Sequence, residues 1–103
     1  MLIQLKKFGT TLLSRQAGKE ALAAYEPTLR EIKNTETVEI DFEGVNTFAP
    51  SWADEFLTPL LKRYEGRFKV RPSNNPAVRV TINFLEKIHH ISFPRERLYL
   101  DKS

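Results

Sequence analysis

Short strand-like runs of apolar residues alternate three times along the chain with longer stretches of helical period. The first run predicts a strand over residues 2–8 that ends at Gly9. Its apolar members are Leu2, Ile3, Leu5 and Phe8. Alternation of apolar and acidic residues predicts a second strand over residues 38–42, and the segment RFKVR predicts a third strand around Phe68 and Val70.

The first helix is predicted to begin after Ser14, a plausible N-cap, and to end near Asn34 and Thr35. Its apolar face is formed by residues three or four positions apart: Ala17, Ala21, Tyr25, Leu29 and Ile32. Pro27 lies inside this pattern, where its ring removes a hydrogen bond and clashes with the preceding turn. We therefore expect a kink, or a break into two helices, at Pro27.

The second helix is predicted to begin at Ser51, after the loop of residues 46–50. Ser51 and Asp54 have the spacing of a capping box, in which each side chain accepts a backbone N–H from the other residue. Asp54 and Glu55 also place negative charge near the positive end of the helix dipole. A broad apolar face predicts that most of this helix is buried; it consists of Trp52, Phe56, Leu57, Leu60, Leu61 and Tyr64.

The third helix is predicted to have Asn75 as its N-cap and Pro76 at its first position, and to continue to about His90. The residues expected to face the core are Val78, Ile82, Leu85 and Ile88, with Phe84 alongside. Residues 97–100 are a candidate edge strand. Strands alternating with helices of this length imply right-handed crossovers. The expected fold is a single α/β domain over residues 1–103, of order β-α-β-α-β-α with a mainly parallel sheet.

Three polar loops are expected at one edge of this sheet, because ligands of open α/β sheets bind beyond the carboxyl ends of the strands. These loops are residues 9–14, 43–51 and 72–75. The polar side chains that they bring to this edge are Thr10, Thr11, Asn46, Thr47, Ser51, Ser73, Asn74 and Asn75. Thr10, Thr11 and Arg15 form a candidate anion site there, although a solvated arginine is the alternative interpretation of Arg15.

Composition limits the number of domains, the cysteine chemistry and the cellular location that we expect for the protein. A chain of 103 residues can bury one core but not two. Because the sequence contains no cysteine, it offers no disulfide, thiolate zinc site or cysteine nucleophile. The first residues lack the apolar run of a signal peptide, and no stretch is apolar enough to span a membrane. We expect a cytoplasmic protein.

Charge is divided unevenly along the chain, within a formal net charge of +3 at pH 7. Residues 1–60 contain six Lys or Arg and nine Asp or Glu, whereas residues 61–103 contain ten and four. The second half therefore suggests a surface for nucleic acid or another anion, in which Arg67, Lys69 and Arg71 take part. A solvated rim of the sheet is the other interpretation.

No motif of an enzyme or a cofactor site is evident. The segment FGTTLLSR has neither the spacing nor the lysine of a phosphate-binding loop, and no G-x-G-x-x-G follows a strand. His89 and His90 are adjacent, so on a helix they diverge and cannot bind one metal ion together. We therefore predict a non-enzymatic protein with no catalytic residue, metal or cofactor.

Two residues at the start of the second helix allow two interpretations each. Ser51 is either an ordinary N-cap or a candidate phosphorylation site, since the positive end of the helix dipole accommodates a phosphate. Trp52 either covers the core or stands out beside Ser51 as an anchor for a partner.

The segment VEIDFEGVNTFAPSWADEF resembles the STAS-like domain family of unknown function. The residues that carry the resemblance are Asp41, Phe42, Gly44, Val45, Ser51, Trp52, Ala53, Asp54 and Glu55, together with Phe8, Gly9 and Arg15 in the N-terminal region. That family is similar to the STAS domains of bacterial anti-sigma factor antagonists. In those proteins a serine at the start of the corresponding helix is phosphorylated by a partner kinase with a histidine-kinase-type ATPase fold.

The resemblance implies a regulatory module that binds a partner ATPase or kinase. Ser51 falls where the phosphorylated serine of the antagonists lies, although this chain has Ala49, Pro50, Ser51 and Trp52 where the antagonists have D-S-S-G. The residues expected to bind the partner are Asn46, Thr47, Trp52, Asp54 and Glu55.

Overall fold

The structure is a computed structural model that describes residues 1–95. The candidate edge strand at residues 97–100 lies outside this range. The elements in chain order are β1 (Leu2–Gln4), the 3-10 helix η1 (Leu5–Phe8), β2 (Thr11–Leu12), α1 (Arg15–Leu29), β3 (Val38–Asp41), β4 (Thr47–Phe48), α2 (Pro50–Arg63), β5 (Phe68–Val70) and α3 (Pro76–His89).

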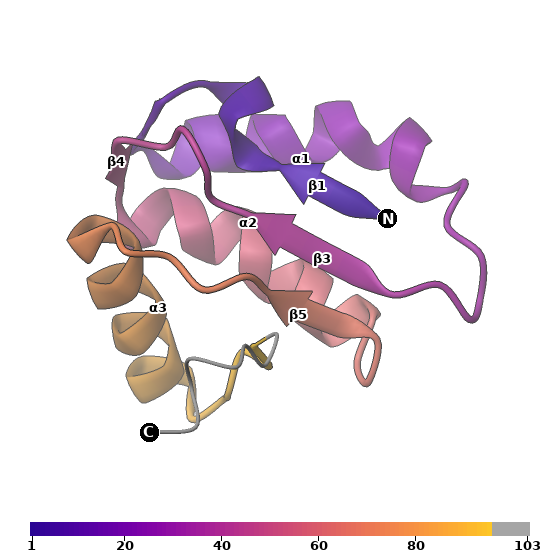
Figure 1. The fold of residues 1–103 in the computed structure, drawn as a ribbon. Helices are drawn as coiled ribbons and strands as arrows, with labels where there is room; N and C mark the ends of the chain where they lie inside the picture. Colours follow the sequence, from indigo (N-terminus) through magenta and orange to yellow (C-terminus); the bar gives the residue numbers. More distant parts are fainter. Residues whose placement is uncertain (96–103) are drawn as a thin grey trace.

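The main sheet has three parallel strands in the order β1-β3-β5, which confirms the predicted parallel α/β fold. Ile3 pairs with Ile40, and Ile40 in turn pairs with Val70, so buried residues lie side by side across the sheet. Helices α1 and α2 lie behind the sheet in Figure 1, while its front carries no helix of the described chain. The alternation predicted for residues 38–42 arises because only one face of the sheet is buried.

The first predicted strand is wrong in its extent. It is divided into β1, η1 and β2, and β2 pairs with β4 in a second parallel sheet of two strands. Leu5 and Phe8 are three residues apart, which is the spacing of one helical turn and not of a strand. The turn directs Phe8 toward Tyr25 and Phe56, with ring centroids 5.6 and 5.0 Å apart respectively.

Helix α1 ends five residues earlier than predicted. The Ser14 cap is confirmed, because its side chain accepts a hydrogen bond from the Ala17 amide at 3.0 Å. Pro27 does not divide the helix in two, since α1 ends two residues later at Leu29. From there the chain leaves the helix in short turns, in which the Ile32 amide donates to the Leu29 carbonyl.

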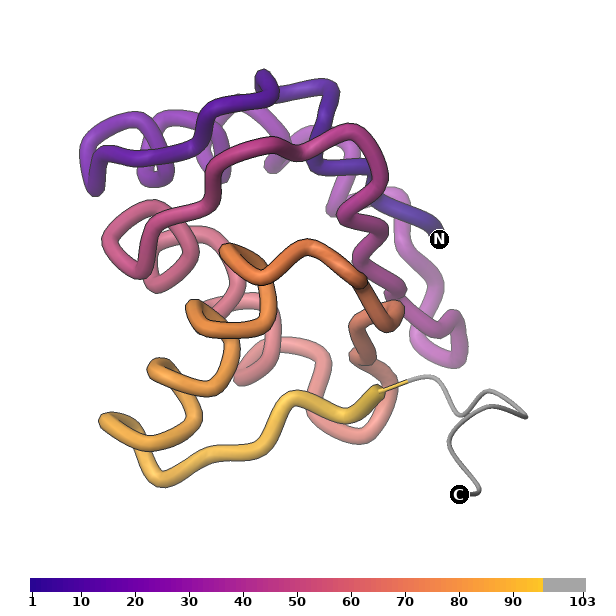
Figure 2. Tube along the Cα trace, turned by 60° about the vertical axis from the view of Figure 1, so that its left-hand side comes forward, coloured from indigo at the N-terminus to yellow at the C-terminus, as the bar shows by residue number. Residues whose placement is uncertain are grey.

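Helix α3 packs at the carboxyl end of the strands. Its predicted cap is confirmed, since the Asn75 side chain accepts from the Ala77 amide at 2.8 Å and Pro76 is the first helical residue. After α3 the chain returns to the sheet (Figure 2), where the Val70 amide donates to the Pro94 carbonyl.

At Gly18 helix α1 lies directly against the backbone of α2. A Cβ at this position would lie 2.5 Å from the carbonyl oxygen of Trp52 and 3.0 Å from its Cα. Both are backbone atoms of α2, which cannot move aside as the end of a flexible side chain does. The crossing therefore requires a glycine.

Replacing Gly18 with alanine tests this contact. Helix propensity alone favours alanine by about 1 kcal/mol, but forcing α1 away from α2 is expected to lower the free energy of unfolding by about 1–3 kcal/mol. Urea denaturation measures the difference, with the exposed neighbour Lys19→Ala as a control expected to change stability by less than about 0.5 kcal/mol. A Gly18→Ala protein that is more stable than the wild type would show that the helices have room to spare.

Candidate functional site

The three polar loops converge at the carboxyl end of the strands, as predicted. The Thr10 carbonyl accepts hydrogen bonds from the amides of Asn46 and Thr47, at 2.8 and 3.1 Å. The Asn75 side chain donates to the carbonyls of Val45 and Asn46, at 2.7 and 3.2 Å. The three loops are thus joined directly, through backbone groups of two of them and the Asn75 side chain of the third, and the side chains of Thr10, Asn46 and Thr47 remain exposed.

The predicted capping box at the start of α2 is wrong. Pro50 takes the first helical position and Ala49 is the N-cap, with no side-chain cap bond. Proline favours this position because its φ angle is already helical and it needs no amide partner. The helix therefore begins one residue before Ser51, and the Ser51 side chain, half-buried in the first turn, serves no capping role.

Trp52 belongs to the core and is not an exposed anchor for a partner. Its side chain is 1% exposed, and its ring stacks on Phe56 with centroids 5.0 Å apart and an interplanar angle of 21°. Phe48 and Phe8 contact other sides of the same ring, at 5.9 and 6.1 Å. Of the two interpretations of Trp52, the structure selects the buried one.

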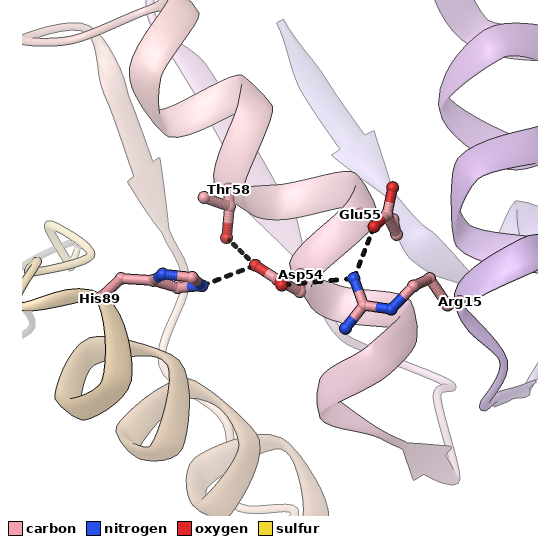
Figure 3. Close-up of polar contacts among 5 residues, drawn as sticks. All are labelled: Arg15, Asp54, Glu55, Thr58 and His89. Atoms are coloured by element: carbon pink, nitrogen blue, oxygen red, sulfur yellow. Dashed lines mark hydrogen bonds and ion pairs between the residues drawn. The ribbon is translucent and has the colours of Figure 1, made fainter.

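Asp54 lies at the centre of a polar cluster that joins all three helices (Figure 3). Its Oδ1 accepts from the Thr58 hydroxyl at 2.9 Å and lies 2.9 Å from Nε2 of His89, at the end of α3. Its Oδ2 is 3.4 Å from Nη1 of Arg15, which also binds the Glu55 carboxylate. Asp54 therefore connects α2 to α1 on one side and to α3 on the other.

Arg15 is consequently engaged by two carboxylates and does not face an open anion site with Thr10 and Thr11. The alternative interpretation, that Arg15 is simply solvated, describes only part of what is observed. The side chain is about half exposed, but its guanidinium group is paired with carboxylates. Asp54 and Glu55, predicted to bind a partner, are in fact half-buried in this cluster.

His89 was not predicted to reach this edge of the molecule. The sequence nevertheless contained a signal. The buried residues Val78, Ile82 and Leu85 recur every three or four positions, and His89 follows Leu85 by four, so it shares their face of α3; the prediction chose Ile88, three residues after Leu85. Continuing that series by four residues instead of three would have put His89 on the inner side of the helix.

The electrostatics of Asp54 follow from these contacts. Burial raises its pKa, but the hydrogen bonds from Thr58 and His89, and the bond from Arg15, outweigh burial and leave the pKa below its ordinary value. The ionised carboxylate is the form that fits the cluster.

The outer side of α3 carries a stripe of exposed apolar residues. Val80, Phe84 and Ile88 lie four residues apart and are 65%, 46% and 47% exposed, so the predicted placement of Phe84 and Ile88 in the core is wrong. Thr81, which follows Val80 in the chain, is buried, and its hydroxyl donates to the Phe48 carbonyl at 2.6 Å. This bond holds the α3 stripe (Val80, Phe84 and Ile88) beside β4 and the start of α2.

Several basic residues of the second half have partners on the first half of the chain. Arg63 makes two bonds to the Glu26 carboxylate, at 3.0 and 2.9 Å. Arg67 donates to the carbonyls of Lys33 and Glu36. Arg63 and Arg67 of the basic second half are thus bonded to groups of the first half of the chain.

Residues 1–95 contain no group of three or more acidic, histidine or cysteine side chains placed to hold a metal ion. Within the same range no helix combines the length and the apolar character needed to cross a membrane.

A parallel sheet with helices on one face, and loops gathered at the carboxyl ends of its strands, defines a small α/β domain. The chain belongs to the family described as STAS-like domain of unknown function (DUF4325), whose model matches residues 25–77. This match covers β3, β4, α2 and β5 and confirms the resemblance noted in the sequence. No curated protein and no solved structure gave a significant match.

Replacing Asp54 with asparagine tests the helix cluster. Because the pKa of Asp54 is lower in the folded chain than in the unfolded chain, its contribution to stability is present at neutral pH and is lost as the pH falls below about 4. Asp54→Asn is expected to lower the free energy of unfolding by about 1–2 kcal/mol at pH 7.

The same variant is expected to show a smaller loss of stability between pH 7 and pH 3, as measured by denaturant unfolding at both values. Glu43→Gln, an exposed change of the same charge, is the control and should follow the wild type. If Asp54→Asn loses as much stability as the wild type between pH 7 and pH 3, the contacts of the ionised Asp54 carboxylate do not stabilise the fold.

Proposed function

We propose that this protein is a non-enzymatic regulatory module that docks a protein partner at the carboxyl edge of its sheet. The observation that supports this most directly is the exposed α3 stripe beside the polar loops. Exposed apolar side chains rimmed by polar ones are typical of protein contact surfaces. Membership of a STAS-like family favours the same class of function.

The proposed docking surface consists of Asn46, Thr47, Ser51 and the α3 stripe. The loop residues are exposed and rigidly held through the Thr10 carbonyl and the Asn75 side chain. A surface that is already ordered loses little conformational entropy when it binds. Asp54, Glu55 and Arg15 border this surface and fix the relative positions of the helices that carry it.

The proposed partner is a cytoplasmic bacterial ATPase or kinase of the histidine-kinase type. This choice rests on the similarity of the family to anti-sigma factor antagonists.

Ser51 is the proposed switch of this docking surface. Its hydroxyl does not cap the helix, and the N-cap residue Ala49 has no side-chain acceptor for the first amides of α2. A phosphate on Ser51 would therefore lie at the positive end of the helix, near amides that need an acceptor. Because Asp54 and Glu55 follow by three and four residues, the new charge would repel both and compete with them for Arg15.

Replacing Phe84 with serine tests the docking surface. Phe84 is exposed, so the variant is expected to fold with nearly the stability of the wild type, and to bind a partner ATPase at least tenfold more weakly, a loss of about 1.4 kcal/mol. Isothermal titration calorimetry against an ATPase encoded beside this chain measures the affinity.

Leu2→Ser is the matched control, since Leu2 is 40% exposed on the front of the sheet, away from the docking surface. Equal losses in the two variants would place the interface elsewhere, and an unchanged affinity of Phe84→Ser would exclude the α3 stripe.

Modification of Ser51 is tested by incubating the protein with the same ATPase and ATP and measuring its intact mass. One added phosphoryl group is expected on the wild type and on Ser73→Ala, and none on Ser51→Ala. Ser51→Asp is expected to weaken docking at least tenfold, because it places a charge in the middle of the surface. If the wild type gains no phosphate and Ser51→Asp binds normally, Ser51 is not a switch, although docking through the α3 stripe would still stand.

A further inference from the structure

A cavity of about 210 Å³ lies between the chain that follows β5 and the side of α3 away from the α3 stripe. Three arginines, Arg71, Arg79 and Arg95, line it, and Ser73 and Asn83 add a hydroxyl and an amide. Its remaining lining is apolar, from the core residues Phe42, Val70, Val78 and Ile82 and the exposed Pro72, and no acidic side chain of the described residues lines it. The cavity therefore combines an apolar floor with a basic and polar rim.

Two of the three guanidinium groups form ion pairs with carboxylates outside the cavity. Nε of Arg71 lies 3.6 Å from Glu39, and Nη2 of Arg95 lies 3.3 Å from Glu86. Arg79 makes no ion pair within the described residues, so its charge is not compensated. The charged groups of residues 1–95 that line the cavity itself are therefore all guanidinium groups, whereas Asp41 and Glu43 line an adjoining hollow that also contains Arg71 and Ser73.

The size of the cavity limits the ligand. Sites for drug-sized molecules are about 300–1,000 Å³, so 210 Å³ suits a small anion and excludes full enclosure of a nucleotide. Guanidinium groups match phosphate and carboxylate oxygens with paired hydrogen bonds. Three such groups around one cavity favour the three terminal oxygens of a phosphoryl group over the two oxygens of a carboxylate.

We propose that this cavity binds the phosphoryl group of a small phosphate monoester, or free phosphate, through Arg71, Arg79 and Arg95. Ser73 and Asn83 supply further hydrogen bonds to its oxygens. The proposal is independent of partner docking, because Arg79 and Asn83 lie on a different side of α3 from Val80 and Phe84.

The test is an NMR titration of the ¹⁵N-labelled protein with inorganic phosphate and with glycerol 3-phosphate, in about 0.15 M salt to screen weak surface charges. Saturable shifts are expected for the amides of residues 71–83, with a dissociation constant of about 1 mM or lower. Arg79→Gln is expected to weaken binding about tenfold or more. Arg30→Gln, which removes the same charge from the exposed end of α1, should bind as the wild type does.

Asn83→Asp provides a second variant, since it introduces a negative charge into the cavity and is expected to abolish binding. Its spectrum without ligand shows whether it is folded. Shifts that grow linearly without saturation, or equal losses in Arg79→Gln and Arg30→Gln, would reduce the effect to general electrostatic attraction and overturn the proposal. Equal affinity for succinate would overturn the preference for a phosphoryl group, whereas tighter binding of glycerol 3-phosphate than of phosphate would identify a monoester as the ligand.

Discussion

The crossing of α1 and α2 at Gly18 is the contact on which the rest of the structure depends. With no Cβ at Gly18, the backbone of Trp52 approaches α1 directly, and the indole ring is enclosed among aromatic side chains. Arg15 lies one turn before Gly18, and Glu55 one turn after Trp52, so the same crossing brings the two charges together. An exposed ion pair contributes about 0–1 kcal/mol, whereas burial of one aromatic side chain contributes about 1.5–3 kcal/mol. Packing of Trp52 and Gly18 therefore determines how α1 crosses α2, and the ion pair between Arg15 and Glu55 forms as a result of that crossing.

Helix α3 is placed by a different set of contacts and presents two unlike surfaces. The buried Thr81 hydroxyl fixes its middle to β4, and His89 fixes its end to Asp54 of α2. Away from these inner contacts, one outer side of α3 is apolar, around Phe84, and another is basic, around Arg79. Asp54 links the second turn of α2 directly to the end of α3.

Local sequence predicted those features that depend on neighbouring residues alone. The caps at Ser14 and Asn75 were correct because each side chain needs only an amide two or three residues away. Strands β3 and β5 were recognisable because one buried face imposes strict alternation, whereas the extent predicted for β1 was wrong. Prediction failed where two local signals competed, as when Pro50 began α2 and left the Ser51 cap without a role. The convergence of the three loops was also predictable, since it follows from the topology of a parallel sheet.

Relations between helices were decided only by the tertiary structure. The sequence by itself determined the fold class, the order of the three main strands and three α-helices, and the edge at which the loops meet, but not η1 or the small sheet of β2 and β4. It left open whether Trp52 pointed inward. The spacing from Leu85 places His89 on the inner side of α3, but nothing in the sequence pairs it with Asp54 or brings Arg79 to a cavity. The inward position of Trp52 depends on where α1 passes α2, at Gly18, between residues more than thirty positions apart. The contact of His89 with Asp54 depends on the separate packing of α3. A pattern within one helix shows which residues share a face, but the neighbouring helix decides how much of that face is covered.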